Sequence, residues 1–286
     1  MNWVIIGCGY TGERLAAVLV GQGSAVTVTR RSAADAGAIA ARLGCDARAA
    51  DLSKPSSLSG WIPAHSIVAV CAPPGEPPGR GEAALVGACA SAGTCRIVYV
   101  SSTGVYPEGG GAWIDEDVAP DPVGAHGRRR LEAETSLLTA AATQGLEAVS
   151  LRAAGIYGAG RGMHVRLAAG DYRVIGDGAT FVNRIHVDDL VGAILAAAEV
   201  AALRGRIYNV ADDEPVTSRQ AADAVAGMLG LPPPPSIPLE QASEMARAMM
   251  RANRRISNAR LKAELGWSPR YPTYREGVPA AIASGQ

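Results

Sequence analysis

Short apolar runs alternate with helix-length segments over the first 152 residues of the chain. Each run has the length of a strand, and the runs lie at 3–6, 25–29, 45–50, 67–71, 96–101 and 146–152. Between them, helical segments are predicted at 12–20, 33–43, 80–92 and 127–143. Strands that alternate with helices need crossover connections, which produce a parallel sheet. Because the strands are apolar almost throughout, we expect helices to cover both faces of this sheet.

The pattern changes after residue 155, where a glycine-rich stretch begins. The predicted elements that follow are helices at 163–169, 187–200, 218–229 and 238–250, a strand at 207–210, a proline spacer at 232–235 and short turns over 256–286. The whole pattern predicts an α/β protein with a doubly wound parallel Rossmann sheet and a small, mostly helical C-terminal substrate lobe. The predicted Rossmann domain comprises 1–155 and 185–211, and the predicted lobe comprises 156–184 and 212–286.

The composition excludes several functional classes. The 286 residues include 27 basic and 27 acidic side chains, so the chain lacks the net positive field that holds proteins on nucleic acid or anionic membranes. The longest apolar stretch, 190–203, contains Glu199 and is too short to span a bilayer. No signal-peptide pattern opens the chain, and the five cysteines show no metal-ligand spacing. We therefore expect a cytoplasmic protein without a metal that acts on a small-molecule substrate.

A glycine motif follows the first predicted strand and opens the first predicted helix. Its spacing is G-x-G-x-x-G, and its residues are Gly7, Cys8, Gly9, Tyr10, Thr11 and Gly12. In this context the first glycine permits a tight turn, the second admits a pyrophosphate and the third lets the helix pack on the strand. The helix N-terminus offers free N–H groups to the phosphates. The segment therefore predicts a dinucleotide site, and the residues expected to bind the cofactor are Gly7, Gly9, Tyr10, Thr11 and Gly12.

The end of the second strand indicates which dinucleotide binds. An NAD site places an acidic residue about 20 residues after the glycine motif, where it binds the ribose 2′-hydroxyl. Here Arg30 and Arg31 follow the strand, and the first acid beyond them is Asp35. Guanidinium groups suit bidentate binding of a 2′-phosphate, so the sequence favours NADP over NAD. The alternative is that both arginines are solvated loop charges.

The fifth strand ends in the motif 98–106, and with it the chain resembles an extended short-chain dehydrogenase/reductase of the NAD-dependent epimerase/dehydratase branch. The resemblance covers nearly the whole chain. Its other motifs lie at 51–52, 151–152, 155–158, 184–190, 208–211, 265–267 and 271–272. The resemblance implies that Asp51 and Leu52 contact adenine, that Ala72 also lines the cofactor and that the protein forms a homodimer.

The chain departs from the family at its catalytic motif. The family's usual chemistry needs a Ser or Thr together with Tyr-x-x-x-Lys, in which the tyrosine is the general acid/base and the lysine binds the nicotinamide ribose. Ser102 matches the first requirement, but His126 occupies the tyrosine position and Arg130 occupies the lysine position. The chain has only two lysines, Lys54 and Lys262, and neither follows a tyrosine by four residues.

The residues that replace the family's motif can still carry out its chemistry. We expect Ser102 to polarise a substrate oxygen, His126 to relay the proton and Arg130 to hold the ribose. His126 and Arg130 are four residues apart on a predicted helix, so they share a face. An imidazole with an ordinary pKa near ~6.5 exchanges protons at neutral pH, unlike an unassisted phenol. The alternative is a basic, solvated helix start, with catalysis lost or placed elsewhere.

Other polar residues are candidates for substrate binding or for structure. Thr103, Arg161 and His164 lie where the resemblance places the substrate pocket, whereas His186 is expected to hold a helix start. Four arginines form a basic set, namely Arg247, Arg251, Arg254 and Arg255. This set either binds a substrate phosphate, as the resemblance implies, or forms a charged helix face. The acidic run at 115–117 lacks a nearby histidine or cysteine and is expected to be a loop.

Three functions fit these residues. The first is NADP(H)-dependent oxidoreduction of a small or nucleotide-linked carbonyl or alcohol by hydride transfer. The second is a non-catalytic NADP-binding sensor or partner protein, which the missing Tyr-Lys pair suggests. The third is a nucleotide-sugar epimerase or dehydratase. The short C-terminal lobe favours a small substrate and therefore the first function.

Overall fold

The structure, a computed structural model, describes residues 1–285, and of Met245 only the backbone. Clustering of contacts divides the chain into two compact units. The first unit comprises Met1–Ser102, Arg128–Arg152 and Ala193–Tyr208. The second unit comprises Thr103–Gly127, Ala153–Gly192 and the residues from Asn209 onward. Gln286, which the sequence assigned to the substrate lobe, lies outside the described residues.

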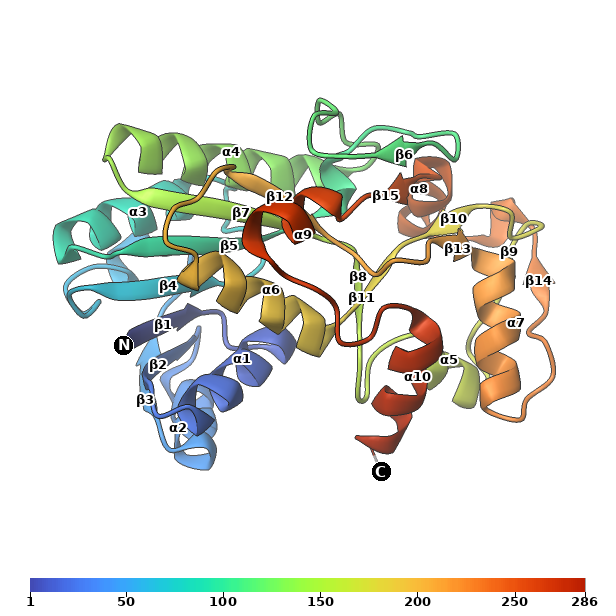
Figure 1. Cartoon of the computed structure of the whole chain (residues 1–286), viewed down its shortest axis with the longest axis horizontal. Coiled ribbons are helices and arrows are strands. Elements are labelled where there is room, and N and C mark those ends of the chain that lie inside the picture. The colour runs from blue at the N-terminus through green and yellow to red at the C-terminus, as the bar shows by residue number, and fades with distance from the viewer. Residues whose placement is uncertain (286) are drawn as a thin grey trace. The chain divides into compact units, whose positions relative to one another are not determined.

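A seven-stranded sheet runs through the first unit in the order β12-β7-β5-β4-β1-β2-β3 (Figure 1). Its strands are β1 Asn2–Ile6, β2 Ala25–Arg30, β3 Asp46–Ala49, β4 Ser66–Val70, β5 Arg96–Ser102, β7 Glu147–Ala153 and β12 Ile207–Val210. The pairs β1–β2, β1–β4, β2–β3 and β4–β5 are parallel. The strand order reverses between β1 and β4, which is where such sheets bind their ligands. The predicted doubly wound Rossmann sheet is therefore confirmed.

Helices cover both faces of this sheet. They are α1 Tyr10–Gly21, α2 Ala33–Leu43, α3 Arg80–Ala92, α4 Ala125–Thr143 and α6 Val187–Glu199. Figure 1 shows α3 and α4 on one face and α1, α2 and α6 on the other. Local signals explain the sharp bounds of α2, because the Ser32 side chain accepts a hydrogen bond from the Asp35 N–H and Gly44 ends the helix in a left-handed conformation.

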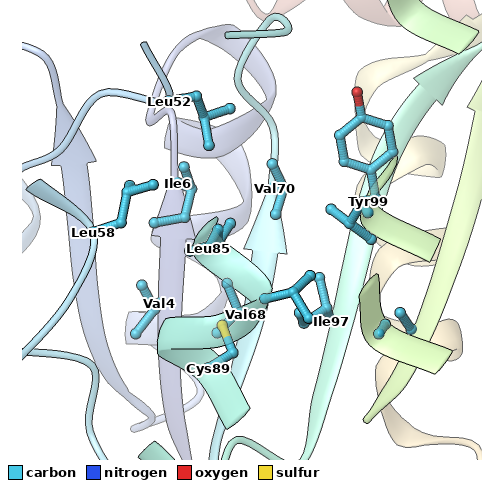
Figure 2. Close-up of a cluster of buried hydrophobic side chains, with 14 of the residues drawn as sticks. Val4, Ile6, Leu52, Leu58, Val68, Val70, Leu85, Cys89, Ile97 and Tyr99 are labelled. Atoms are coloured by element: carbon cyan, nitrogen blue, oxygen red, sulfur yellow. The ribbon is translucent and has the colours of Figure 1, made fainter. Parts of the chain in front are cut away.

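The core between the sheet and α3 and α4 is aliphatic, as a chain with one phenylalanine requires. Figure 2 shows part of it, with side chains from β1, β4 and β5 packed against Leu85 and Cys89 of α3. Tyr99 is the aromatic member of this cluster, and its hydroxyl points away from the aliphatic side chains (Figure 2). The hydroxyl is thus directed out of the core, and its partner belongs to the functional site described below.

A buried ion pair joins α4 to β7 in the first unit. Arg152 donates to Glu134 at 2.6 Å, and the Ser150 hydroxyl donates to the same carboxylate at 2.8 Å. The side chains of Arg152 and Glu134 are each only 2% exposed. Two sequence motifs that are separate along the chain, the Leu-Glu-Ala-Glu of α4 and the Leu-Arg of β7, are therefore one structural feature.

The second unit consists of short elements. They are η2 Thr103–Val105, β6 Trp113–Ile114, β8 Gly155–Tyr157, α5 Met163–Ala168, β9 Val174–Ile175, β10 Phe181–Val182, β11 Arg184–His186, β13 Val216–Thr217, α7 Ser218–Met228, β14 Ser236–Ile237, η3 Leu239–Gln241, α8 Glu244–Ala252, β15 Arg255–Ile256, α9 Ala259–Leu265 and α10 Tyr274–Ala283. The stretch 103–127 belongs here rather than with the Rossmann residues, because β6 pairs with β15.

Two expectations for the C-terminal part are wrong. The stretch 238–250 is not one helix, since η3 and α8 are separated at Ala242 and Ser243. The tail does not consist of short turns, since it contains α9 and α10. Pro279 lies inside α10, and a proline in the sequence is a signal against a helix. A capping box between Thr273 and Glu276 nevertheless starts this helix, and Tyr274 and Val278 are buried.

Two late sequence motifs meet at Asp189 in the second unit. Its carboxylate accepts the backbone N–H groups of Arg270, at 2.5 Å, and Tyr271, at 3.1 Å, and its carbonyl accepts the indole N–H of Trp267. The predicted structural role of His186 is confirmed, because its Nδ1 accepts the backbone N–H of Asp188 at 3.2 Å. No described helix is long and apolar enough to cross a membrane.

Candidate cofactor and active site

The glycine turn lies at the switch point of the sheet. Gly7 has a φ of 85°, and a Cβ there would lie 2.6 Å from backbone atoms of Ala72, which follows β4. A Cβ on Gly12 would lie 2.8 Å from the carbonyl oxygen of Gly7. Thr29 holds the turn from β2, because its hydroxyl accepts the Gly7 N–H at 3.0 Å. Both glycines are therefore required by close approach, and the contact of Ala72 with the cofactor stays a prediction.

Arg30, at the end of β2, lies against the glycine turn. Its Nη1 is 3.9 Å from the position of a Cβ on Gly9, and its Nη2 donates to Glu13 at 3.4 Å. The Nε of Arg30 is buried and has no hydrogen-bond partner among the described residues. Arg31, by contrast, is exposed. The two arginines for which the sequence predicts the same role thus differ in environment, and Arg30 is the one that lies against the glycine turn.

Asp51 and Leu52 shape the loop that follows β3. The Asp51 carboxylate accepts the Ser53 N–H at 2.9 Å, which folds the loop back on itself. Leu52 is buried, and its carbonyl oxygen lies 1.8 Å from the position that a Cβ on Gly81 would take. This contact fixes the start of α3 against the loop. Both residues therefore have a clear structural part in this edge of the first unit, and their adenine contact stays a prediction.

Arg130 is fixed at the carboxyl ends of β4 and β5. Its Nη1 donates to the carbonyls of Ala72, at 3.3 Å, and Val100, at 3.1 Å, and to the Tyr99 hydroxyl at 3.1 Å. Burial raises the pKa of Tyr99 to about 12, although the Arg130 charge partly opposes this. The Arg130 Nε is buried and lacks a partner within residues 1–285. The side chain is thus held in place, and its Nε–H is still available for an acceptor.

Ser102 and His126 lie in different units. Ser102 is the last residue of β5 and is half-buried, whereas His126 is exposed in the first turn of α4. Within the second unit, a Cβ on Gly127 would lie 2.2 Å from the carbonyl oxygen of Gly104. The turn that carries His126 therefore packs directly on η2, the turn that begins at Thr103 and follows Ser102 in the chain.

The predicted substrate residues Arg161 and His164 differ in burial. Arg161 is exposed, and its backbone pairs with that of Gly158. His164 is 5% exposed in α5, and burial lowers the pKa of its imidazole. A neutral His164 adds no positive charge for an anionic substrate, whereas the exposed Arg161 does.

Arg254 and Arg255 do not form the expected charged helix face, because both follow α8 and both are engaged. Arg254 is 7% exposed and donates to the carbonyls of Thr103, Tyr106 and Pro107 at 2.6–2.8 Å. Arg255 stacks between two aromatic rings, which belong to Trp113 and Phe181. Arg254 therefore holds the turn after Ser102. No local signal in the sequence could have predicted this, because its partners lie about 150 residues earlier.

A buried polar cluster occupies the second unit. Its members are Tyr157 of β8, Arg184 of β11, Tyr274 of α10 and Asp212, which follows β12. Each has a buried polar atom without a hydrogen-bond partner in the described part of the chain. Burial raises the pKa of Asp212 from its ordinary 3.8 to about 8, and the Arg184 charge opposes this in part. At neutral pH the folded protein therefore carries Asp212 mainly as the neutral acid.

The shifted Asp212 predicts a pH dependence of stability. Between about pH 4 and pH 8 the folded protein keeps a proton that the unfolded chain has released, so stability falls as pH rises through this window. Asn cannot ionise, so the melting temperature of Asp212→Asn relative to the wild type should rise between pH 5 and pH 8. Differential scanning calorimetry across this range measures it, and a constant difference would show that Asp212 titrates normally.

Comparison with known proteins fits this geometry. Residues 3–211 match the protein family described as the NAD dependent epimerase/dehydratase family. The chain belongs to this family. The family assignment confirms the resemblance drawn from the sequence motifs, and together with reductase and epimerase relatives it identifies the chain as an enzyme of the NAD(P)-dependent epimerase/dehydratase type.

Three similar proteins illustrate the range of the family. The 3-diazoavenalumate denitrifying reductase of a Streptomyces species is 31% identical, over 94% of this chain and 96% of its own length. A UDP-glucose 4-epimerase of Corynebacterium glutamicum is 27% identical, over 70% of this chain and 66% of its own. The solved structure of a functionally unknown protein from Silicibacter pomeroyi matches with a TM-score of 0.83 and 32% identity, and covers 99% of this chain and 98% of its own.

Proposed function

We propose that this family member is an NADP(H)-dependent oxidoreductase that acts on a small carbonyl or alcohol substrate by hydride transfer. One observation carries the proposal. The Nε atoms of Arg30 and Arg130 are both buried, and neither has a hydrogen-bond partner among residues 1–285. Arg30 lies at the end of β2, and Arg130 is anchored at the ends of β4 and β5. A buried donor without an acceptor is costly, so each of these groups favours a ligand oxygen.

The environment of Arg30 supports NADP at the adenosine end. Its guanidinium lies beside Gly9, in the part of the motif where backbone approaches the pyrophosphate. A 2′-phosphate would give its buried N–H a charged acceptor, and Arg31 would add a second positive charge from solvent. Because no acidic residue stands at the end of β2, the ribose hydroxyl of NAD has no partner supplied by that strand.

Arg130 supports the nicotinamide end. A bound nicotinamide supplies or accepts the hydride in this family's chemistry. Arg130 takes the lysine's place with a permanent charge, and its anchoring on Ala72 and Val100 leaves Nε for a ribose hydroxyl. A guanidinium stays protonated in proteins, so Arg130 can bind and orient the ribose but does not itself transfer protons.

His126 and Ser102 are proposed to handle the substrate oxygen. An exposed imidazole exchanges a proton at neutral pH without help from a lysine. The packing of Gly127 on Gly104 holds the start of α4 against the turn that follows Ser102. In this proposal the Ser102 hydroxyl donates to the oxygen of the substrate, and His126 gives or takes its proton.

The test is turnover by point variants. With NADPH and a panel of ketones, aldehydes and diazo compounds, His126→Ala and Ser102→Ala should each lower kcat by about 100-fold or more, in line with loss of a general acid or an oxyanion donor. Arg128→Ala, in the same turn of α4, serves as the control and should retain activity. Unchanged rates in both variants would show that the proton comes from elsewhere.

The epimerase relative supports a second candidate, a nucleotide-sugar epimerase. That activity would interconvert sugar epimers without net oxidation of NADPH. The engagement of Arg254 with three backbone carbonyls weighs against it, because this basic residue is then not available for a substrate phosphate. Incubation with UDP-glucose and analysis for UDP-galactose distinguishes the two, since the oxidoreductase is expected to leave UDP-glucose unchanged.

A further inference from the structure

Glu13 joins two arginines beside the glycine turn. It lies in the first turn of α1, and its carboxylate accepts from Arg30 at 3.4 Å and from Arg42 of α2 at 2.5 Å. The side chains are 31% exposed for Glu13, 39% for Arg30 and 59% for Arg42, so the group is open to solvent on one side. One carboxylate therefore holds two guanidinium groups, and the three residues carry one net positive charge.

The same three side chains act on the glycine turn itself. Burial is the main reason that the pKa of the Cys8 thiol rises to about 12, but Glu13 raises it further and Arg30 and Arg42 lower it. Cys8 is the second residue of the glycine motif, so the Glu13 group lies within electrostatic reach of the backbone that approaches the cofactor. Glu13 comes from the helix side of the motif, directly after Gly12.

The position of Glu13 matters because of what stands at the end of β2. An NAD site has a carboxylate there, and here the strand ends in Arg30 instead. Glu13 delivers a carboxylate to the same guanidinium from α1. With a 2′-hydroxyl on the adenosine ribose, nothing would compete with that carboxylate, and it would remain the counter-ion of Arg30. When the ribose carries a 2′-phosphate, the phosphate competes with Glu13 for Arg30, and Arg42 stays with Glu13.

We propose that Glu13 is a cofactor-selecting residue whose carboxylate neutralises Arg30 and thereby lets the site accept NADH as well as NADPH. The proposal rests on the proposed role of Arg30 in binding the 2′-phosphate. Glu13 lowers the preference for NADPH because its carboxylate competes with the 2′-phosphate for Arg30. Arg42 weakens this competition because it pairs with the same carboxylate. Loss of Glu13 and loss of Arg42 must then shift the preference in opposite directions.

Binding of adenosine fragments tests this without turnover. Calorimetric titration with adenosine 2′,5′-bisphosphate and with 5′-AMP gives two Kd values for each variant. Their ratio measures how much the 2′-phosphate contributes to binding. In Glu13→Gln the preference for the bisphosphate should rise roughly 3- to 5-fold at low salt, the size expected for one partly exposed ion pair. In Arg42→Gln it should fall by a similar factor. Added salt should shrink both shifts.

The outcomes separate this inference from the proposed function. If Arg30→Gln abolishes the preference but Glu13→Gln leaves it unchanged, the role of Glu13 is wrong and that of Arg30 stands. Shifts of the same sign in Glu13→Gln and Arg42→Gln would also overturn the role of Glu13, since both would then act through the local fold. If the wild type shows no preference and Arg30→Gln changes nothing, the 2′-phosphate role of Arg30 itself is wrong.

Discussion

Replacing Arg130 with alanine is expected to weaken the binding of NADPH and of NADH alike, by about 10- to 100-fold, which is the usual loss for a hydrogen bond to a charged group. The two cofactors are identical at the nicotinamide end, where Arg130 is fixed by Ala72, Tyr99 and Val100. An equal loss for both cofactors therefore distinguishes Arg130 from Arg30, whose replacement should weaken NADPH alone. Fluorescence titration of the reduced cofactors measures both values.

Two further variants control this result. Arg129→Ala removes the neighbouring guanidinium, which pairs with Glu76 on the surface, and should leave both affinities within about twofold, as expected of an exposed pair. Arg130→Lys restores the residue type that the family uses and should retain most of the affinity. If Arg130→Ala binds both cofactors as the wild type does, the guanidinium does not hold the ribose.

Replacing Glu134 with alanine is expected to lower the free energy of unfolding by about 3–5 kcal/mol, the usual cost of leaving a buried charge without its partner. Arg152 would keep its charge in a site that is 2% exposed, and Ser150 would lose its acceptor. Urea unfolding followed by circular dichroism gives the difference. Both side chains of this pair are buried, whereas the Arg96–Glu147 pair of the same unit has an exposed carboxylate.

A matched control lies in the same unit. Glu147 pairs with Arg96, but its side chain is 50% exposed, so Glu147→Ala should cost less than about 1 kcal/mol. The double variant Glu134→Leu/Arg152→Met should recover much of the loss, because an apolar pair needs no counter-charge. Equal losses for Glu134→Ala and Glu147→Ala would show that burial does not set the strength of these pairs.

The Rossmann part of the fold was predictable from sequence because its signals are local. Apolar runs gave β1, β4 and β5, and the glycine motif gave the start of α1 in the right register. The second unit was harder, since strands of two or three residues such as β6 and β15 leave no periodicity and pair across more than a hundred residues. In the tail, short turns were predicted in place of α10, because a proline such as Pro279 is a signal against a helix.

The candidate site divides in the same way. Gly7 and Arg130 could be placed from motif spacing, because spacing on one strand or helix fixes a residue's position. The side-chain partners of the two arginines could not, since Tyr99 contacts Arg130 from β5 and Glu13 contacts Arg30 from α1. Arg254 shows the limit most clearly, because a residue read as surface charge holds the turn after Ser102.

The central claim is that two guanidinium groups, Arg30 and Arg130, hold the two ends of an NADP molecule. A crystal structure of the protein with NADP⁺ tests it most directly. We predict that the 2′-phosphate lies within hydrogen-bond distance of the Arg30 guanidinium and that a nicotinamide-ribose hydroxyl accepts from Arg130. A 2′-phosphate directed into solvent away from Arg30, together with a ribose that makes no contact with Arg130, would contradict it.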